Sequence, residues 1–455
     1  MKIGDKINIT IEKLIFGGEG LGHVDNFTFF VPMAVPGDEL EAEIISMKKD
    51  YGRALITKII KPSESRVSEL HKITFEDFQG CDYAMIKYDK QLEYKKEILL
   101  ETLAKISKID MNDVDFQGII EAKTTVNYRN KVAEPFTKKE GKIITGFYQK
   151  KSHDIFEVEE NILRSRIADK MTKKLLKKLN DGEFTVYNEV NKTGFLRYLL
   201  VRNNSENEVM ITVVINKTTQ LRNLKSVLLK LAEENKEIIS IYVSLKDGDG
   251  NYILGDEHKL IFGQEFLEED INGIKFKIYP DSFFQVNSEQ TVKLYDKAIE
   301  YLGDSEDKWI IDAFSGTGTL GMLIAKNARK VYCIESVESS VISAKKVAEE
   351  NGIRNIRFKL GKVENKLSEI LKATPMDGII FDPPRKGIDE LTLKSVGKNR
   401  IKRIVYISCN PSTFARDTKL LYELGYKLDR LTAVDMFPQT HHIEVVGEFN
   451  RVEKK

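Results

Sequence analysis

The order of hydrophobic and polar positions divides the chain into three segments, and the first predicts a small β-barrel. In residues 1–60, Ile7, Ile9 and Ile11 alternate with polar residues at the period of a half-buried strand. A glycine-rich turn separates them from an apolar run at residues 27–35, and two further short runs follow. About five short strands joined by such turns predict an OB-like β-barrel, either a general accessory domain or one that carries RNA.

The second segment, residues 61–275, has a mixed pattern. It begins with a short polar linker at residues 61–65, and charged residues laced through an apolar stripe predict a helix over residues 89–109. Strands are expected over residues 125–136, 141–149, 195–202, 208–215 and 238–244. We therefore expect a central α+β domain, with the helix at 89–109 packed on the domain that follows.

The third segment, residues 276–455, alternates apolar strands with helical stretches. The strands are expected over residues 309–314, 330–335, 356–360, 378–382, 400–408, 427–435 and 443–449. Helices between the first five strands predict a parallel, doubly wound α/β sheet. The loop between the last two is too short for a helix, so we expect an antiparallel pair at the edge of a mostly parallel seven-stranded sheet.

Composition and charge exclude several classes of protein. The 455 residues include 71 Lys and Arg against 70 Asp and Glu, so the net charge is +1 and only local basic faces remain for a polyanion. No apolar run is long enough to span a membrane, and the N-terminus lacks the apolar core of a secretory signal. Three scattered cysteines are too few for a disulfide framework. We expect a globular, cytoplasmic protein.

A glycine loop between the first strand and first helix of the α/β sheet predicts a nucleotide-like ligand. Gly316, Gly318 and Gly321 satisfy the pattern G-x-G-x-x-G, with a bare tight turn as the alternative. Glu335 ends the next strand about 20 residues further on, where a carboxylate accepts hydrogen bonds from ribose hydroxyls. Asp312 precedes the glycines and would repel the pyrophosphate of a dinucleotide. Because the same charge attracts an ammonium group, the loop favours S-adenosylmethionine over NAD.

A second group of residues predicts chemistry at the same rim, because ligands of open α/β sheets bind at the carboxyl ends of the strands. One strand ends at Asp382, followed by two prolines, and the next ends at Cys409, followed by Asn410. A cysteine at a strand terminus beside a cofactor loop is a candidate nucleophile, with a structural thiol as the alternative. Cys333 lies within an apolar run and is expected to be an inert core thiol.

The motifs together resemble a known family. Their order is similar to that of the 5-methyluridine RNA methyltransferases, S-adenosylmethionine-dependent enzymes that act on uracils of bacterial ribosomal RNA and of tRNA. The resemblance covers nearly the whole chain and rests on residues 284–287, 312–321, 382–385, 408–411 and 441–444. It implies a TRAM-like RNA-binding barrel at 1–60, a central RNA-binding domain at 61–275, and a Rossmann-like, class I methyltransferase domain at 276–455.

The resemblance also implies roles for single residues. Cys409 would be the nucleophile and Glu444 the proton acceptor. With the glycine loop, contacts to S-adenosyl-L-methionine are expected from Gln285, Asp312, Phe314, Gly316, Gly318, Glu335 and Asp382. No metal site is expected at His441 and His442, because no further ligands lie nearby in the sequence.

These residue types suit methylation of uracil at C5. A thiolate that adds to C6 makes C5 nucleophilic toward the methyl group, and a base then removes the C5 proton so that the thiolate leaves. The target base must leave its stack to reach the cysteine. Phe283 or Phe437 would support it by stacking, unless either belongs to the core. His441 and His442 would polarise the site.

In one feature the chain departs from the family. Many relatives hold a [4Fe–4S] cluster through four cysteines, three of them closely spaced and one further on. Only Cys81 remains at the first group, and the distal position holds Asn161. One thiol cannot hold such a cluster, so no iron–sulfur cluster is expected.

The resemblance leaves the RNA partner open between two classes. The TRAM-like barrel favours 23S ribosomal RNA, because tRNA-specific bacterial relatives typically lack it, although archaeal tRNA enzymes can carry one. A tRNA uracil is the alternative substrate. An alternative of another class is a catalytically silent RNA-binding or ribosome assembly factor. The presence of Cys409 and Glu444 argues against this alternative. An amino-directed methyltransferase would need no thiol. No protein partner is predicted.

Overall fold

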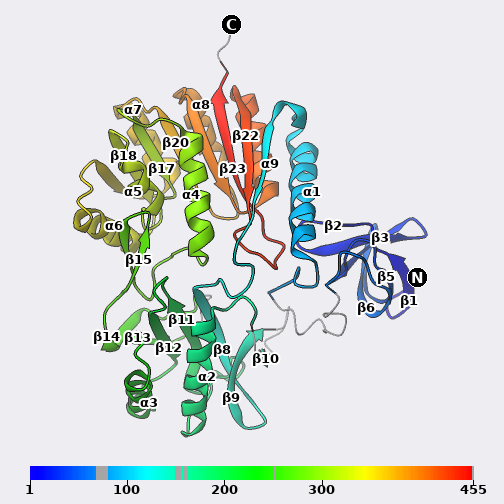
Figure 1. Ribbon diagram of the computed structural model, residues 1–455, viewed down its shortest axis with the longest axis vertical. Helices are drawn as coiled ribbons and strands as arrows, with labels where there is room; N and C mark the ends of the chain where they lie inside the picture. The colour runs from blue at the N-terminus through cyan, green and yellow to red at the C-terminus, as the bar shows by residue number, and fades with distance from the viewer. Residues whose placement is uncertain (68–79, 149–154, 158–160, 249, 251, 453–455) are drawn as a thin grey trace.

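The computed structural model describes residues 1–67, 80–148, 155–157, 161–248, 250 and 252–452. It shows three units: a small barrel at the N-terminal end, a central unit with one sheet, and a large C-terminal unit that contacts both (Figure 1). Among the described residues, no helix is long and apolar enough to cross a bilayer.

The N-terminal unit is a six-stranded sheet that curls so that β1 contacts β3. Its strands are β1 (Lys6–Thr10), β2 (Lys13–Leu14), β3 (Glu19–Val24), β4 (Phe27–Pro32), β5 (Glu39–Met47) and β6 (Tyr51–Lys61), in the order β1-β5-β6-β4-β3-β2. The alternation seen in the sequence is real, since Ile7, Ile9 and Ile11 are all buried in the barrel core. The expected linker does not hang free, because Arg66 just beyond it makes a buried ion pair of 2.8 Å with Asp38 of the barrel.

The central unit is a seven-stranded sheet with helices on one face. Its elements are β8 (Lys131–Lys139), β9 (Lys142–Tyr148), β10 (Ile155–Glu157), α2 (Arg166–Asn180), β11 (Leu196–Asn203), β12 (Val209–Ile215), α3 (Leu221–Glu233), β13 (Ile238–Leu245) and β14 (Glu257–Gly263). The strand order is β10-β9-β8-β11-β12-β13-β14, and α2 and α3 pack side by side over it. Met210 and Tyr242 on the opposite face join the core of the C-terminal unit, so that face is turned toward it.

The C-terminal unit confirms the predicted doubly wound sheet. Its strands are β17 (Trp309–Ala313), β18 (Lys330–Glu335), β19 (Ile356–Leu360), β20 (Gly378–Phe381), β21 (Arg403–Ser408), β22 (Tyr426–Val434) and β23 (Glu444–Arg451). Its helices are α4 (Ser288–Leu302), α5 (Thr319–Ala325), α6 (Glu338–Glu350), α7 (Val363–Ala373), α8 (Glu390–Lys398) and α9 (Pro411–Glu423). The hairpin of β15 (Leu267–Ile271) and β16 (Ile274–Ile278) packs beside α5 and α6. Strands β17 to β21 are parallel, and β23 runs antiparallel between β21 and β22.

Two details of the predicted organisation are wrong. The sheet has an eighth described strand, β7 (Asp115–Ile120), which pairs in parallel with β22, so the antiparallel pair does not form the sheet edge. Helix α1 (Tyr88–Ser107) packs on α9, as expected. Residues 88–120 therefore lie with the C-terminal unit and not with the central domain expected at 61–275. The six residues of β7 are too few to reveal a partner more than 300 residues away.

Candidate active site

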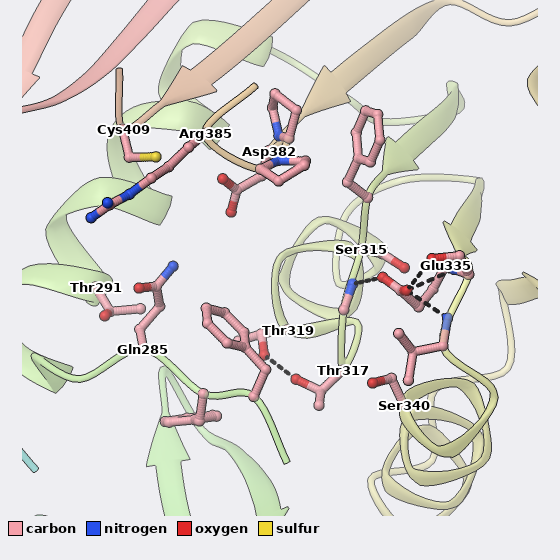
Figure 2. A pocket seen from close by; sticks show the side chains of 18 of the residues that line it. Gln285, Thr291, Ser315, Thr317, Thr319, Glu335, Ser340, Asp382, Arg385 and Cys409 are labelled. Carbon is pink, nitrogen blue, oxygen red and sulfur yellow. Dashed lines mark hydrogen bonds between the residues drawn. The ribbon is translucent and has the colours of Figure 1, made fainter. Parts of the chain in front are cut away.

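The predicted site residues converge on one cavity of about 830 Å³ at the carboxyl ends of the parallel strands. Seven of the nine line it: Gln285, Phe314, Gly316, Glu335, Asp382, Cys409 and Glu444. Figure 2 shows Cys409, Arg385 and Asp382 at one end of this cavity and Glu335 with Ser340 at the other. The remaining two, Asp312 and Gly318, do not line the cavity.

Glu335 is held in place by backbone amides at the end of β18. Its Oε2 atom accepts from the Gly316 amide at 2.9 Å, and its Oε1 atom accepts from the amides of Ser336 and Val337 at 2.6 and 2.7 Å (Figure 2). Its Oε1 atom also accepts from the Ser336 hydroxyl at 3.2 Å, whereas the Oε2 atom has one donor among the described residues, so Oε2 retains capacity for a hydroxyl of a bound ligand. The sequence-predicted ribose acceptor is thus preformed and faces the cavity.

The glycines of the loop serve two different purposes. A Cβ atom at Gly316 would meet nothing within 4 Å, so this position leaves open space for a ligand. A Cβ at Gly318 would come within 2.7 Å of the Phe358 ring, and one at Gly321 within 2.4 Å of the Cys333 sulfur. These two glycines permit packing behind the loop. Phe314 adopts a φ of +66°, a strained conformation of the kind found at binding sites.

Asp312 lies outside the lining of the cavity. Only 1% of it is exposed, and its carboxylate accepts from the Gly321 amide and lies 3.9 Å from the Cys333 sulfur, behind the loop. Burial, reinforced by the nearby charge of Asp382, raises the pKa of Asp312 to about 7. The two strands that pair with β17 do bring carboxylates to the cavity: Glu335 at the end of β18 and Asp382 just after β20.

Cys409 sits in the tight turn between β21 and α9. Asn410 caps α9 through its Oδ1 atom, which accepts from the Ser412 amide at 3.0 Å, and Pro411 begins the helix. This fixed turn presents the thiol to the cavity. Burial and the Glu444 carboxylate raise the pKa of Cys409 to about 11, while the Arg385 guanidinium opposes that shift.

Glu444 and Asp382 also favour their protonated forms. Burial and the charge of Asp382 raise the pKa of Glu444 well above its ordinary value, again opposed by Arg385. Burial raises the pKa of Asp382 to about 7. Cys409, Glu444 and Asp382 therefore share a partly desolvated end of the cavity. The exposed Arg385 lowers the pKa of the first two.

The loop that leads into Glu444 is clamped by the N-terminal half of the chain. Lys95 of α1 makes an ion pair of 2.6 Å with Asp435, and neither side chain is more than 1% exposed. The Gln91 side chain accepts from the Gln439 amide at 3.0 Å and donates to its side-chain oxygen at 2.9 Å. Phe437 and His442 of this loop line the cavity.

The two histidines of the loop differ in environment. His442 lines the cavity, and burial with the neighbouring His441 lowers the pKa of His442 to about 3, so it is neutral. His441 does not line the cavity and is hydrogen-bonded to Asp82. Of the two predicted stacking candidates, Phe283 is 66% exposed on the cavity wall, whereas Phe437 also packs against the core.

Cys81 and Cys333 are buried, and Asn161, at the position where relatives have the fourth cluster cysteine, makes a local hydrogen bond. Burial raises the pKa of Cys81 to about 12, and Cys333 is fully buried, as the sequence predicted. The Asn161 side chain accepts from the Leu163 amide at 2.9 Å. In the part of the chain that the structure describes, no three His, Cys, Asp or Glu side chains gather as metal ligands.

Several lining residues had no assigned role in the sequence. Arg129 reaches the cavity from the segment before β8, and Lys362 and Val337 border the end near Glu335. Arg385 lies inside a motif that the sequence did single out, and its charge after two prolines at the rim was a usable signal. Arg129 lies 280 residues before Cys409 along the chain, so no local pattern links the two.

The chain was compared with known families and proteins. A family model described as tRNA (Uracil-5-)-methyltransferase matches residues 87–449, and one described as the TRAM domain matches residues 1–57. A protein of Fusobacterium nucleatum named an uncharacterized RNA methyltransferase is 49% identical over 452 residues, which cover 99% of this chain and 97% of that protein. One of Clostridium tetani with the same description is 34% identical, covering 98% and 96%.

A solved structure agrees with these matches. The tRNA (uracil-54, C5)-methyltransferase of Pyrococcus abyssi in complex with S-adenosyl-L-homocysteine superposes with a TM-score of 0.77 at 28% identity, covering 97% of this chain and all of that one. The first residue of the longer family match, 87, coincides with the start of α1, the helix that packs with the C-terminal unit. Because the family model matches most of the chain and the relatives span nearly all of it, the chain belongs to the tRNA (uracil-5-)-methyltransferase family and carries a TRAM domain at its N-terminal end.

Proposed function

We propose that this enzyme transfers a methyl group from S-adenosylmethionine to C5 of a uridine in 23S ribosomal RNA, through a covalent bond between Cys409 and C6. The observation that carries the proposal is the meeting of Cys409 and Glu444 in one cavity whose other end presents Glu335. Family membership supports the coarser statement, an S-adenosylmethionine-dependent RNA methyltransferase acting on uracil C5.

The cavity fits the methyl donor. At one end, Glu335 has acceptor capacity for ribose hydroxyls and Val337 and Val363 offer apolar surface for an adenine. Toward the other end, the ammonium and sulfonium of the donor would favour the ionised form of Asp382 against the effect of burial, and that form supplies the negative charge. When bound, S-adenosylmethionine supplies an electrophilic methyl group. The residues of the chain orient that group and handle the protons.

The reacting residues would act in a fixed order. The Cys409 thiolate forms a C–S bond at C6, which moves electron density to C5. C5 then forms its bond to the methyl carbon while the bond from that carbon to the sulfonium sulfur breaks, so the electron pair stays on sulfur and S-adenosylhomocysteine leaves. Glu444 takes the C5 proton, and the electron pair of that C–H bond restores the ring double bond as the C–S bond breaks. Arg385 favours the thiolate electrostatically. Because burial raises the pKa of Glu444, this residue must first lose its own proton, and the carboxylate that results is a stronger base than an ordinary one.

An exposed aromatic ring supports recognition of a base taken out of its stack. Phe283 is 66% exposed on the cavity wall, and a large apolar side chain in that position offers a stacking surface. Arg129, Arg385 and Lys386 also line the cavity and would face the phosphate backbone around the extruded nucleotide.

A tRNA uridine is the second candidate substrate. The TRAM domain supports ribosomal RNA, whereas the Pyrococcus abyssi tRNA enzyme supports tRNA. Because that match covers 97% of this chain, the barrel is compatible with either substrate. A catalytically silent RNA-binding or assembly factor is less well supported, since such a protein would have no need for a thiol and a carboxylate at one end of the cavity.

The experiment is methyl transfer from labelled S-adenosylmethionine to unmodified 23S ribosomal RNA and to unmodified tRNA in separate reactions. We expect label at C5 of uridine in the ribosomal RNA, lost in Cys409→Ala. Label in tRNA alone would show that a tRNA uridine, and not one of the ribosomal RNA, is the substrate. Transfer that survives Cys409→Ala would exclude the covalent route, and binding of RNA without transfer to either would favour the silent factor.

A further inference from the structure

Two cations face each other on the helix-free face of the central sheet. Lys131 of β8 pairs directly with Arg202 of β11 in the antiparallel register, so their side chains point to the same side. Strands β8 and β11 are neighbours in the central sheet (Figure 1). Like charges directly opposite each other on a sheet are destabilising, so this pairing calls for an explanation.

The charge of this pair is poorly compensated within the protein. Arg202 is 4% exposed, donates to the carbonyl of Ser282, and has a buried Nε atom without a partner. The acid that acts on it is the exposed Asp281. In the described part of the chain, no hydrogen bond or ion pair joins the Lys131 ammonium to another group. Burial and Arg202 lower the pKa of Lys131 to about 8.

The pair is tied to the wall of the active-site cavity. Asn130 lies between Arg129 and Lys131, and its amide donates to the Val286 carbonyl at 2.9 Å. Its side chain donates to the Gln285 carbonyl at 3.1 Å. Arg129 lines the cavity and has a buried Nε atom without a partner. Lys131 and Arg202 do not line it, but Lys131 is two residues from Arg129, and Arg202 donates to the Ser282 carbonyl, next to the lining residue Phe283.

We propose that Lys131 and Arg202 form a cradle for a backbone phosphate of the RNA strand next to the methylated nucleotide. A phosphodiester places one negative charge and several acceptor oxygens between the two cations, which relieves their repulsion and gives the free guanidinium donor a partner. The carboxylate of the methyl donor is a poorer fit, because neither cation reaches the cavity. This inference rests on the proposed function only in taking RNA as the substrate.

The test compares Lys131→Gln with Lys177→Gln, a control that removes an exposed lysine from α2 on the opposite, helix-covered face. The probe is a uridine-containing RNA stem-loop, and its affinity is measured over a series of salt concentrations. We expect Lys131→Gln to bind about tenfold more weakly at low salt and to lose about one unit of the salt slope. Lys177→Gln and Lys131→Arg are expected to keep the slope.

Thermal unfolding separates this role from a structural one. Since Lys131→Gln removes one of two like charges, it is expected to be at least as stable as the unchanged protein while binding RNA less well. An unchanged salt slope in Lys131→Gln would overturn the cradle, and so would weaker binding of S-adenosylmethionine. Failure to methylate any RNA would overturn the proposed function instead, while the salt slope would still decide the cradle.

Discussion

The two ends of the cavity are built on opposite principles. At the end near Glu335, a carboxylate is held by three backbone amides at 2.6–2.9 Å, so its position is set before any ligand arrives. At the end near Cys409, the acids are desolvated and retain protons that they must give up or exchange. Satisfied hydrogen bonds suit recognition, whereas perturbed protonation suits chemistry.

The comparison predicts that changes at the two ends will separate kinetically. Substitutions near Cys409 should act on the bond-making steps, and those near Glu335 on the affinity for the methyl donor. Four experiments test this division, beginning with the largest expected effect.

Replacing the thiol should abolish the reaction. Cys409→Ser is expected to reduce methyl transfer by about four orders of magnitude or more, because a hydroxyl neither adds nor leaves as readily as a thiolate. The measurement is label incorporated into the RNA substrate, with S-adenosylmethionine binding as the control that shows an intact cavity. Activity within tenfold of the unchanged enzyme would remove Cys409 from the mechanism.

Replacing the base should stop the reaction at a later point. Glu444→Gln is expected to reduce turnover by about 10²- to 10⁴-fold, because no group then removes the C5 proton. The C–S bond between Cys409 and the methylated uridine should persist as a protein–RNA species that withstands denaturing electrophoresis. The double variant that also carries Cys409→Ala should show no such species. If Glu444 does not remove the C5 proton, Glu444→Gln alone should also show none, and that outcome would contradict its role as the base.

At the recognition end, Glu335→Gln is expected to raise the KM for S-adenosylmethionine about 10- to 100-fold while kcat changes by less than about fivefold. The amide nitrogen of the new side chain would face the donors of Gly316 or of Ser336 and Val337, so one hydrogen-bonding arm is lost. Ser336→Ala removes only a hydroxyl at 3.2 Å and should have a small effect. A collapse of kcat with normal KM would contradict the division of the cavity.

The smallest effect concerns the thiol in the absence of RNA. The Glu444 carboxylate raises the pKa of Cys409 and Arg385 opposes it, so Glu444→Gln should lower that pKa and Arg385→Gln should raise it above about 11. The pH dependence of iodoacetamide alkylation should shift by about half a unit to one unit, in opposite directions for the two variants. Cys409→Ser supplies the background from the two buried thiols. Shifts in the same direction would contradict the electrostatic account.

The sequence predicted which residues share the cavity where those residues follow the ends of parallel strands. Glu335, Asp382 and Cys409 meet because such ends share one rim of the sheet, a rule that needs no knowledge of packing. The orientation of Asp312 could not be predicted, since it depends on which way a buried carboxylate turns around Gly321. Arg129 was missed for another reason, because it arrives from the central unit through the fold as a whole.

The same distinction applies to the fold. The alternation of apolar and polar residues predicted the barrel, and the succession of strands and helices predicted the seven C-terminal strands. The addition of β7 to the sheet was not predictable, because β7 has only six residues and its partner β22 is more than 300 residues away along the chain. Such a pairing depends on which sheet edge is free and on where α1 packs. Neither can be inferred from the sequence of the strand itself.

The ion pair of Lys95 with Asp435 also has a consequence for the newly synthesised chain. The two residues are 340 positions apart, so at about 5–20 residues per second roughly 17–70 seconds of synthesis separate them. Throughout that interval Lys95 has no partner for burial, and α1 cannot dock in its final place without leaving a charge stranded in the interior. Closure of the loop between β22 and β23 on α1 is therefore expected to be one of the last folding events, because it needs residues from both halves of the chain.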